Sequence, residues 1–158
     1  MSAPALNRLP ERASDAARLL GATRTVHYTV AAEDSVQRLA HRSAEFARNP
    51  DILASARLIE LCEWPCMDAV RDIIAPDECT LGAWQRQDHR APVLIGARLV
   101  ITARCVVANH PYSEWEVRVH DGHKSVARAT LGFIVVDRAE FERQRMNPKI
   151  KVPASSSG

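Results

Sequence analysis

The sequence has no apolar run long enough to cross a membrane. No stretch approaches the roughly 18 consecutive apolar residues of a spanning helix, and the longest run near the C-terminus covers only residues 133–136. The first residues also lack the continuous apolar segment of a secretory signal peptide. We therefore expect a cytoplasmic protein without a membrane partner.

The sequence also has little excess charge of either sign. Its 21 lysines and arginines nearly balance 19 aspartates and glutamates, and the basic residues are scattered along the chain. This balance gives no support for a nucleic-acid partner. With 46% hydrophobic and 25% charged residues over 158 positions, the composition is typical of one folded domain and too apolar for a disordered chain.

Motifs for binding metals or nucleoside triphosphates are missing as well. The four cysteines, at positions 62, 66, 79 and 105, form no Cys-x-x-Cys pair, and the six histidines have no ligand spacing. No glycine-rich phosphate loop is present. We therefore expect reduced cysteines in the core, no metal and no cofactor.

Apolar periodicity predicts one strand, one long helix and then four more strands. Strands are expected at residues 23–30, 80–89, 97–107, 113–120 and 124–136, the long helix at 52–74 and a short closing helix at 138–145. Asp121 and Gly122 form a good hairpin signal between the last two strands. These elements predict an α+β fold with one antiparallel sheet and a single long helix packed on one face.

Composition also suggests where the folded domain begins and ends. Residues 1–22 carry two prolines and mixed charges and are expected to form an N-terminal arm. Residues 147–158 carry two prolines and a Ser-Ser-Ser-Gly end and are expected to form a flexible tail, which leaves residues 23–146 as the domain. A one-helix sheet of this length leaves an apolar face or an edge to cover, so we expect at least a dimer.

One carboxylate is out of place on the predicted helix. At about 100° per residue, Cys62, Cys66 and Val70 gather on the side opposite a polar stripe. Glu63 lies roughly 120° from the centre of that stripe, on the flank of the apolar side. Such a group either has a raised pKa at a functional site, or it reaches solvent or an arginine across an interface. Pro65 predicts a kink just after Glu63 or the start of a second helical segment.

Several segments together resemble a known family. Residues 49–66 read Asn-Pro-Asp-Ile-Leu-Ala-Ser-Ala-Arg-Leu-Ile-Glu-Leu-Cys-Glu-Trp-Pro-Cys. This run resembles the central helix of the hot-dog thioesterases, most closely the fluoroacetyl-CoA thioesterase-like group. Residues 75–82, the strand ending in Asp88-His89, the turn at 91–96, the Asp121-Gly122 hairpin and residues 135–141 agree, so the resemblance covers about residues 23–145. It implies a hot-dog fold, with an antiparallel sheet wrapped around one long central helix, and a homodimer with active sites at the subunit interface.

The resemblance also implies a catalytic site of three residues. Ser55 matches the family's hydroxyl position, where threonine is commoner, Glu63 matches its carboxylate and His89 its histidine. Three further positions are expected to contact the substrate: Gly82, which matches a glycine of the family's next strand, Phe46, an aromatic residue before the helix, and Trp84, which we expect to line a larger acyl pocket.

These residue types suit the hydrolysis of a small acyl thioester carried by CoA or by a carrier protein. Glu63 would act as base or nucleophile, His89 would orient it or shuttle a proton, and Ser55 would bind the thioester oxygen, support Glu63 or relay a proton. Attack by water and an acyl-enzyme intermediate both stay open. Eight helical residues would separate Ser55 from Glu63 by roughly 12 Å. Either Ser55 precedes the helix, or the site needs a second subunit.

Less specific interpretations stay open beside this one. Ser55 is a residue type that also caps helices or stands in their first turn, and His89 is also typical of a strand end at the surface. The same fold serves hydratases, dehydratases and cyclases of biosynthetic pathways, and a non-catalytic acyl-binding dimer is a third alternative.

Two further features bear on the substrate. Asn49 stands where the fluoroacetate-selective member of the family has an aromatic residue, which argues against fluoroacetyl-CoA as the substrate. Arg86, Arg90 and Arg98 suit the phosphates of CoA, because arginine forks match phosphate oxygens, or they form a solvated face.

Overall fold

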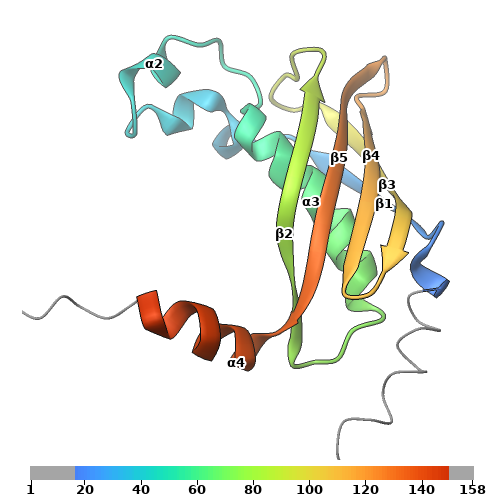
Figure 1. Cartoon of the computed structure of the whole chain (residues 1–158). Helices are drawn as coiled ribbons and strands as arrows, with labels where there is room; N and C mark the ends of the chain where they lie inside the picture. Colours follow the sequence, from blue (N-terminus) through green and yellow to red (C-terminus); the bar gives the residue numbers. More distant parts are fainter. Residues whose placement is uncertain (1–16, 150–158) are drawn as a thin grey trace, which may run out of the picture.

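The computed structural model describes residues 17–149 as one antiparallel sheet packed on one long helix (Figure 1). The sheet contains β1 (Thr23–Thr29), β2 (Glu78–His89), β3 (Arg98–Asn109), β4 (Tyr112–His120) and β5 (Ser125–Asp137). The long helix is α3 (Ser55–Arg71). The remaining elements are short: η2 (Ala32–Asp34), η3 (Val36–Leu39), α2 (Ala44–Ala47), α4 (Arg138–Phe141), η4 (Glu142–Met146) and η5 (Asn147–Lys149).

The strands lie in the order β1-β3-β4-β5-β2, and every neighbouring pair is antiparallel. The predicted α+β fold is therefore confirmed. The 12-residue strand β2 forms one edge of the sheet, and its other side pairs with no strand of the described chain. The predicted hairpin at Asp121 is present, because its carboxylate accepts hydrogen bonds from the backbone N–H groups of His123 and Lys124 while Gly122 adopts a φ of +89°.

The core lies between the inner face of the sheet and α3. Helical spacing buries Leu58, Cys62, Cys66 and Val70 on one side of α3, and alternation along β4 buries Trp115 against them. The helix continues through Pro65 as one element, so no second helical segment begins there. Burial raises the pKa of the Cys62 thiol to about 12, which keeps this thiol protonated and unreactive.

The structure bears only partly on the predicted boundaries of the domain. The predicted arm at 1–22 and tail at 147–158 fall mostly on residues 1–16 and 150–158, which lie outside the described residues. Within the described part, residues 17–19 are helical. The closing helix begins at Arg138, where it was predicted to begin. No helix in residues 17–149 is long and apolar enough to span a membrane.

A buried carboxylate attaches the segment before α3 to the rest of the fold. Asp34 is 3% exposed and ends η2. Its Oδ2 accepts hydrogen bonds from the Tyr28 hydroxyl (2.6 Å) and the Ala31 N–H (2.8 Å), and its Oδ1 accepts one from Arg57 Nε (2.7 Å). Its backbone oxygen accepts the N–H of Ala54, directly before α3. One residue thus joins β1, η2 and the start of the helix.

We predict that Asp34→Ala lowers the free energy of unfolding by about 2 kcal/mol, because the Tyr28 hydroxyl, the Ala31 N–H and the Arg57 guanidinium lose their buried acceptor. Arg57 keeps its ion pair with Glu60, which limits the loss. Urea denaturation followed by circular dichroism measures this loss. Arg138→Ala, which breaks the exposed ion pair with Glu142, serves as the control and should cost less than about 0.5 kcal/mol. Equal losses in the two variants would show that the Asp34 cluster does not anchor the fold.

Candidate active site

Ser55 and His89 meet where α3 begins and β2 ends. The Ser55 Oγ lies 2.9 Å from His89 Nδ1, within hydrogen-bond distance. The helix is capped instead by Ala54, which makes no side-chain capping bond, and Ser55 is the first helical residue. Ser55 is therefore a first-turn residue and not the N-cap, which agrees with one half of the less specific interpretation. Its hydroxyl is directed at the histidine because the first turn of α3 lies beside the end of β2, where Gln87 Nε2 also donates to the Ser55 carbonyl oxygen (3.2 Å).

The imidazole of His89 is partly withdrawn from solvent. Burial lowers the pKa of His89 below its ordinary value, and the nearby Ala91 backbone offsets only part of this effect. Its Nε2 atom is buried and has no hydrogen-bond partner among residues 17–149. A neutral imidazole with one nitrogen on a hydroxyl and the other unpaired is suited to accept or deliver a proton.

Glu63 occupies the flank of α3 that faces β2. Its side chain is half-buried, and a Cβ placed on Gly82 would lie only 3.3 Å from its Oε1 atom. Burial, and to a smaller extent the charge of Glu60, raises the pKa of Glu63 above its ordinary value. No hydrogen bond or ion pair satisfies this carboxylate within the described chain. The helical periodicity thus located a carboxylate that is partly desolvated and has no partner within residues 17–149.

A cavity of about 510 Å³ opens beside Ser55 and His89. Its walls are mostly apolar and come from η3, α2, the start of α3 and the loop after β2. Phe46 and Asn49 both line it, so the residue expected to contact substrate from before the helix lies beside the Ser55–His89 pair. Sequence reasoning did not identify Leu39 or Pro92, which also line the cavity, because neither belongs to a periodic element.

The position of Trp84 differs from the expected one. A β-bulge between Gly82 and Trp84 shifts the register of β2, and Trp84 lies against the face of the sheet that is turned away from α3. There its ring covers Gly132, and its Nε1 donates a hydrogen bond to the Tyr112 hydroxyl (2.6 Å). Trp84 does not line the cavity beside Ser55. The expectation that it lines the acyl pocket is thus corrected.

The structure divides five of the six expected site residues into two groups, and the sixth, Trp84, lies apart from both on the outer face of the sheet. Ser55, His89 and Phe46 share the cavity at the start of α3, whereas Glu63 and Gly82 lie together farther along the helix and β2. Because Ser55 and Glu63 both lie within α3, about 12 Å of helix separates them. One chain therefore holds two partial sites, and neither of them contains all three reactive groups.

Comparison with known proteins identifies relatives of this chain. A model of the fluoroacetyl-CoA-specific thioesterase family matches residues 22–139. The fluoroacetyl-CoA thioesterase of Streptantibioticus cattleyicolor is 28% identical over 132 residues, which cover 82% of this chain and 91% of the relative.

Solved structures agree with this result. A structure of the fluoroacetyl-CoA thioesterase superposes with a TM-score of 0.78 at 26% identity and covers 85% of this chain and 97% of its own. A hot-dog-like protein from Thermanaerovibrio acidaminovorans shares the fold at 16% identity, with a TM-score of 0.67 over 78% of this chain and 87% of its own. The expected hot-dog fold is therefore confirmed.

We predict that Ser55 and His89 are energetically coupled. In a double-mutant cycle with Ser55→Ala and His89→Ala, the coupling energy should be about 1 kcal/mol, the net contribution of one hydrogen bond. Urea denaturation of the four proteins gives this value, and a cycle between Ser55 and the distant Ser113 provides the uncoupled control. If Ser55→Ala costs the same with and without His89, the hydroxyl serves the helix and not the histidine.

Proposed function

The chain belongs to the fluoroacetyl-CoA-specific thioesterase family, and from this premise we propose that it hydrolyses a short- to medium-chain acyl thioester of CoA or of a carrier protein in the cytoplasm. The observation that carries the proposal is the hydrogen-bonded pair of Ser55 and His89 at the mouth of an apolar cavity. A thioester held there has its carbonyl beside a hydroxyl and its acyl chain against apolar walls. A related structure, that of a fluoroacetyl-CoA thioesterase variant with fluoroacetate and CoA, supports an acyl-CoA substrate.

The third reactive group comes, in this proposal, from a second copy of the chain. The free edge of β2 is 12 residues long, and an unpaired edge of this length readily accepts another strand. Antiparallel pairing of two β2 strands about Arg86 sets residue 89 of one copy opposite residue 83 of the other. The partner's Glu63 lies beside its own Gly82, so this pairing brings its carboxylate close to the free Nε2 of His89.

Exposed apolar side chains beside Glu63 support the same dimer. Trp64 is 47% and Met67 38% exposed on α3, and both line a cavity of about 440 Å³ together with Glu63. Exposed aromatic and methionine side chains are typical of surfaces that a partner covers. A partner there would exclude water from the carboxylate and strengthen its interaction with an imidazole.

The completed site has the groups that thioester hydrolysis needs. The Ser55 hydroxyl donates to the carbonyl oxygen as negative charge develops on it, with the backbone N–H groups of the first turn of α3 nearby. The partly desolvated Glu63 either removes a proton from water or attacks the thioester directly, and His89 delivers a proton to the leaving thiolate. Direct attack expels the CoA thiolate and leaves an acyl–Glu63 anhydride, whereas general-base attack by water forms no covalent intermediate. Rapid quenching of a single turnover followed by mass spectrometry distinguishes the two routes, because only direct attack adds the mass of the acyl group to the protein.

The cavity favours an acyl group larger than two carbons. Its volume of about 510 Å³ exceeds what an acetyl group fills, and Asn49 contributes a polar group to a wall that is otherwise mostly apolar. We therefore propose a short- to medium-chain acyl group with room for branching or for one aromatic ring. A panel of acyl-CoAs from acetyl to phenylacetyl measures this preference.

We predict that Glu63→Gln and His89→Ala each lower kcat/KM for the best acyl-CoA about 100-fold or more, because each removes a group that transfers a proton or attacks the thioester. Thiol release followed with a chromogenic disulfide measures the rate. Glu140→Gln and His123→Ala make the same chemical changes away from the site and should keep full activity. The absence of thiol release from every substrate by the wild-type protein would overturn the proposed reaction.

Mixed dimers test whether the site is shared between subunits. In a dimer of one Glu63→Gln chain and one His89→Ala chain, a shared arrangement leaves one complete site and should restore about half of the wild-type activity. If each site lies within one chain, both sites stay damaged and activity stays at the level of the single variants. Differently tagged chains, co-expressed and purified by both tags, give the mixed dimer, and light scattering confirms its mass. A monomer at micromolar concentration would contradict the shared site.

A further inference from the structure

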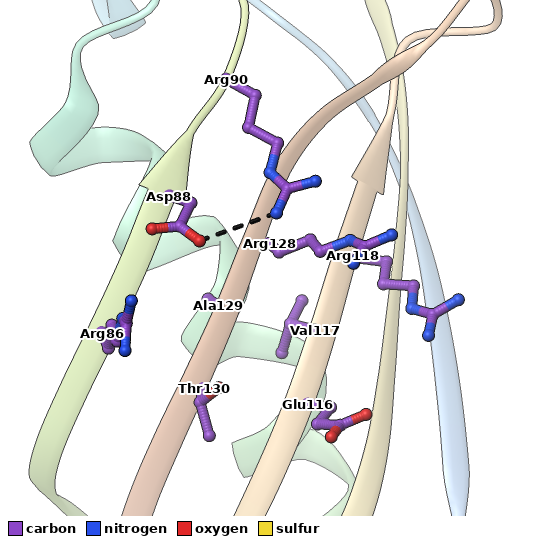
Figure 2. A pocket seen from close by; sticks show the side chains of 9 residues that line it. All are labelled: Arg86, Asp88, Arg90, Glu116, Val117, Arg118, Arg128, Ala129 and Thr130. Atoms are coloured by element: carbon purple, nitrogen blue, oxygen red, sulfur yellow. Dashed lines mark ion pairs between the residues drawn. The ribbon is translucent and has the colours of Figure 1, made fainter.

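The face of the sheet turned away from α3 carries a hollow lined by arginines. Figure 2 shows side chains from β2, β5 and β4 surrounding it, with the ribbon of α3 behind the sheet. The hollow has a volume of about 310 Å³. Four of the lining residues are basic, namely Arg86, Arg90, Arg118 and Arg128. This face lies on the side of the sheet opposite α3, and the hollow is not lined by Ser55, Glu63 or His89.

The charges within the hollow are not neutralised. Only two carboxylates face the four guanidinium groups, those of Asp88 and Glu116 (Figure 2). The single ion pair among the lining residues joins Arg90 to Asp88 at 3.7 Å, between two half-exposed side chains. Arg118 and Arg128 have no ion pair with any residue of the described chain. An anion would therefore meet guanidinium groups that are not already engaged.

The strand register places two of these arginines side by side. Arg118 of β4 lies directly opposite Arg128 of β5 on the same face of the sheet, and Asp88 of β2 lies opposite Arg128 on its other side, so that one carboxylate faces two guanidinium groups in this row. Like charges directly opposite each other on neighbouring strands destabilise a sheet. An anion bound between them reverses this effect, since two guanidinium forks can hold the oxygens of one phosphate group. The pair is therefore arranged to bind an anion. Without an anion, the two like charges destabilise the sheet.

An aromatic ring lies on the same face beside the arginines. Trp84 and Arg86 are two residues apart on β2, so their side chains point the same way about 7 Å apart. A Cβ on Gly132 would lie 2.2 Å from Trp84 Nε1, which shows that the ring covers that glycine. Trp84 is nevertheless 42% exposed, so part of its ring is open for a base to stack on it.

We propose that this hollow binds the phosphate groups of a nucleotide, with the arginines holding the phosphates and Trp84 the base. The site lies within one chain and rests neither on the proposed reaction nor on the dimer. Two ligands share this chemistry: the nucleotide end of a CoA thioester and a free nucleotide that acts as an effector. The first gains support from Arg90, which lines both this hollow and the cavity of Ser55 and His89.

Isothermal titration calorimetry with inorganic pyrophosphate and with adenosine 3′,5′-bisphosphate, at about 50 mM salt, tests the site. The wild-type protein should bind both, the bisphosphate more tightly because of the base. Arg118→Gln combined with Arg128→Gln should weaken both affinities about tenfold or more. Arg138→Gln combined with Arg143→Gln removes the same charge from the helices after β5 and should change them less than about twofold. Trp84→Leu should weaken only the binding of the bisphosphate.

Absence of saturable binding to the wild-type protein, or an equal loss in both double variants, would overturn the proposal. Thermal melting without added anions guards against misfolding, because removing the opposed arginines should leave Tm unchanged or higher. Two substrates then distinguish the ligands. A KM that rises in the Arg118/Arg128 variant for an acyl-CoA, but not for the acyl-pantetheine that lacks phosphates, assigns the site to the substrate. Unchanged KM values with lost nucleotide binding assign it to a free nucleotide.

Discussion

The carboxylate of Asp34 is almost fully withdrawn from water, and the position of the candidate cavity depends on how its charge is satisfied. Burial would raise its pKa, but hydrogen bonds from Tyr28, Arg57 and the Ala31 backbone outweigh that effect and lower it. These partners belong to β1, α3 and the loop between them. The residues that line the cavity on one side follow directly after Asp34, in η3 and α2. The Asp34 cluster therefore fixes the position of this short, irregular segment relative to Ser55. The segment itself has few apolar residues that could hold it in place.

Glu63 has the opposite condition, since its partly buried carboxylate has no partner in the chain. A protein normally avoids this arrangement, because an unpaired desolvated charge costs free energy without stabilising the fold. His89 Nε2 is the matching group, because it is also buried and unpaired. It lies at the end of the edge strand β2, whereas Glu63 lies beside Gly82 in the middle of that strand. Two incomplete sites of complementary chemistry along one free strand edge are simplest to understand as halves of a symmetric pair. Two-fold pairing of β2 would complete both sites at once, whereas a change within one chain would complete neither without breaking α3.

Apolar periodicity in the sequence predicted most strands and the long helix, because the spacing of apolar residues decides which face of each element is buried. Alternation along β4 and helical spacing along α3 predicted these elements within a few residues, and the position of Glu63 on the flank of α3 was visible from periodicity alone. The orientation of the Ser55 hydroxyl was not predictable in this way, because its partner is 34 residues away. Trp84 was misplaced for a similar reason: one bulge reverses the face on which a strand residue lies, and the glycine beneath the ring belongs to β5.

The strand β2 brings these observations together, because its two faces differ in chemistry. Towards α3 it presents Gly82, Gln87 and His89, which contact the residues that carry the proposed reaction. On the other face it presents Trp84 and Arg86, beside the arginines of β4 and β5. In the proposed dimer the two copies of Arg86 come close to the symmetry axis, which adds to the positive charge of that face. A strand that only closed the sheet would need neither an imidazole on one side nor unpaired guanidinium groups on the other. The two faces of β2 are therefore best explained if each binds a different chemical group, a thioester on one face and a phosphate on the other.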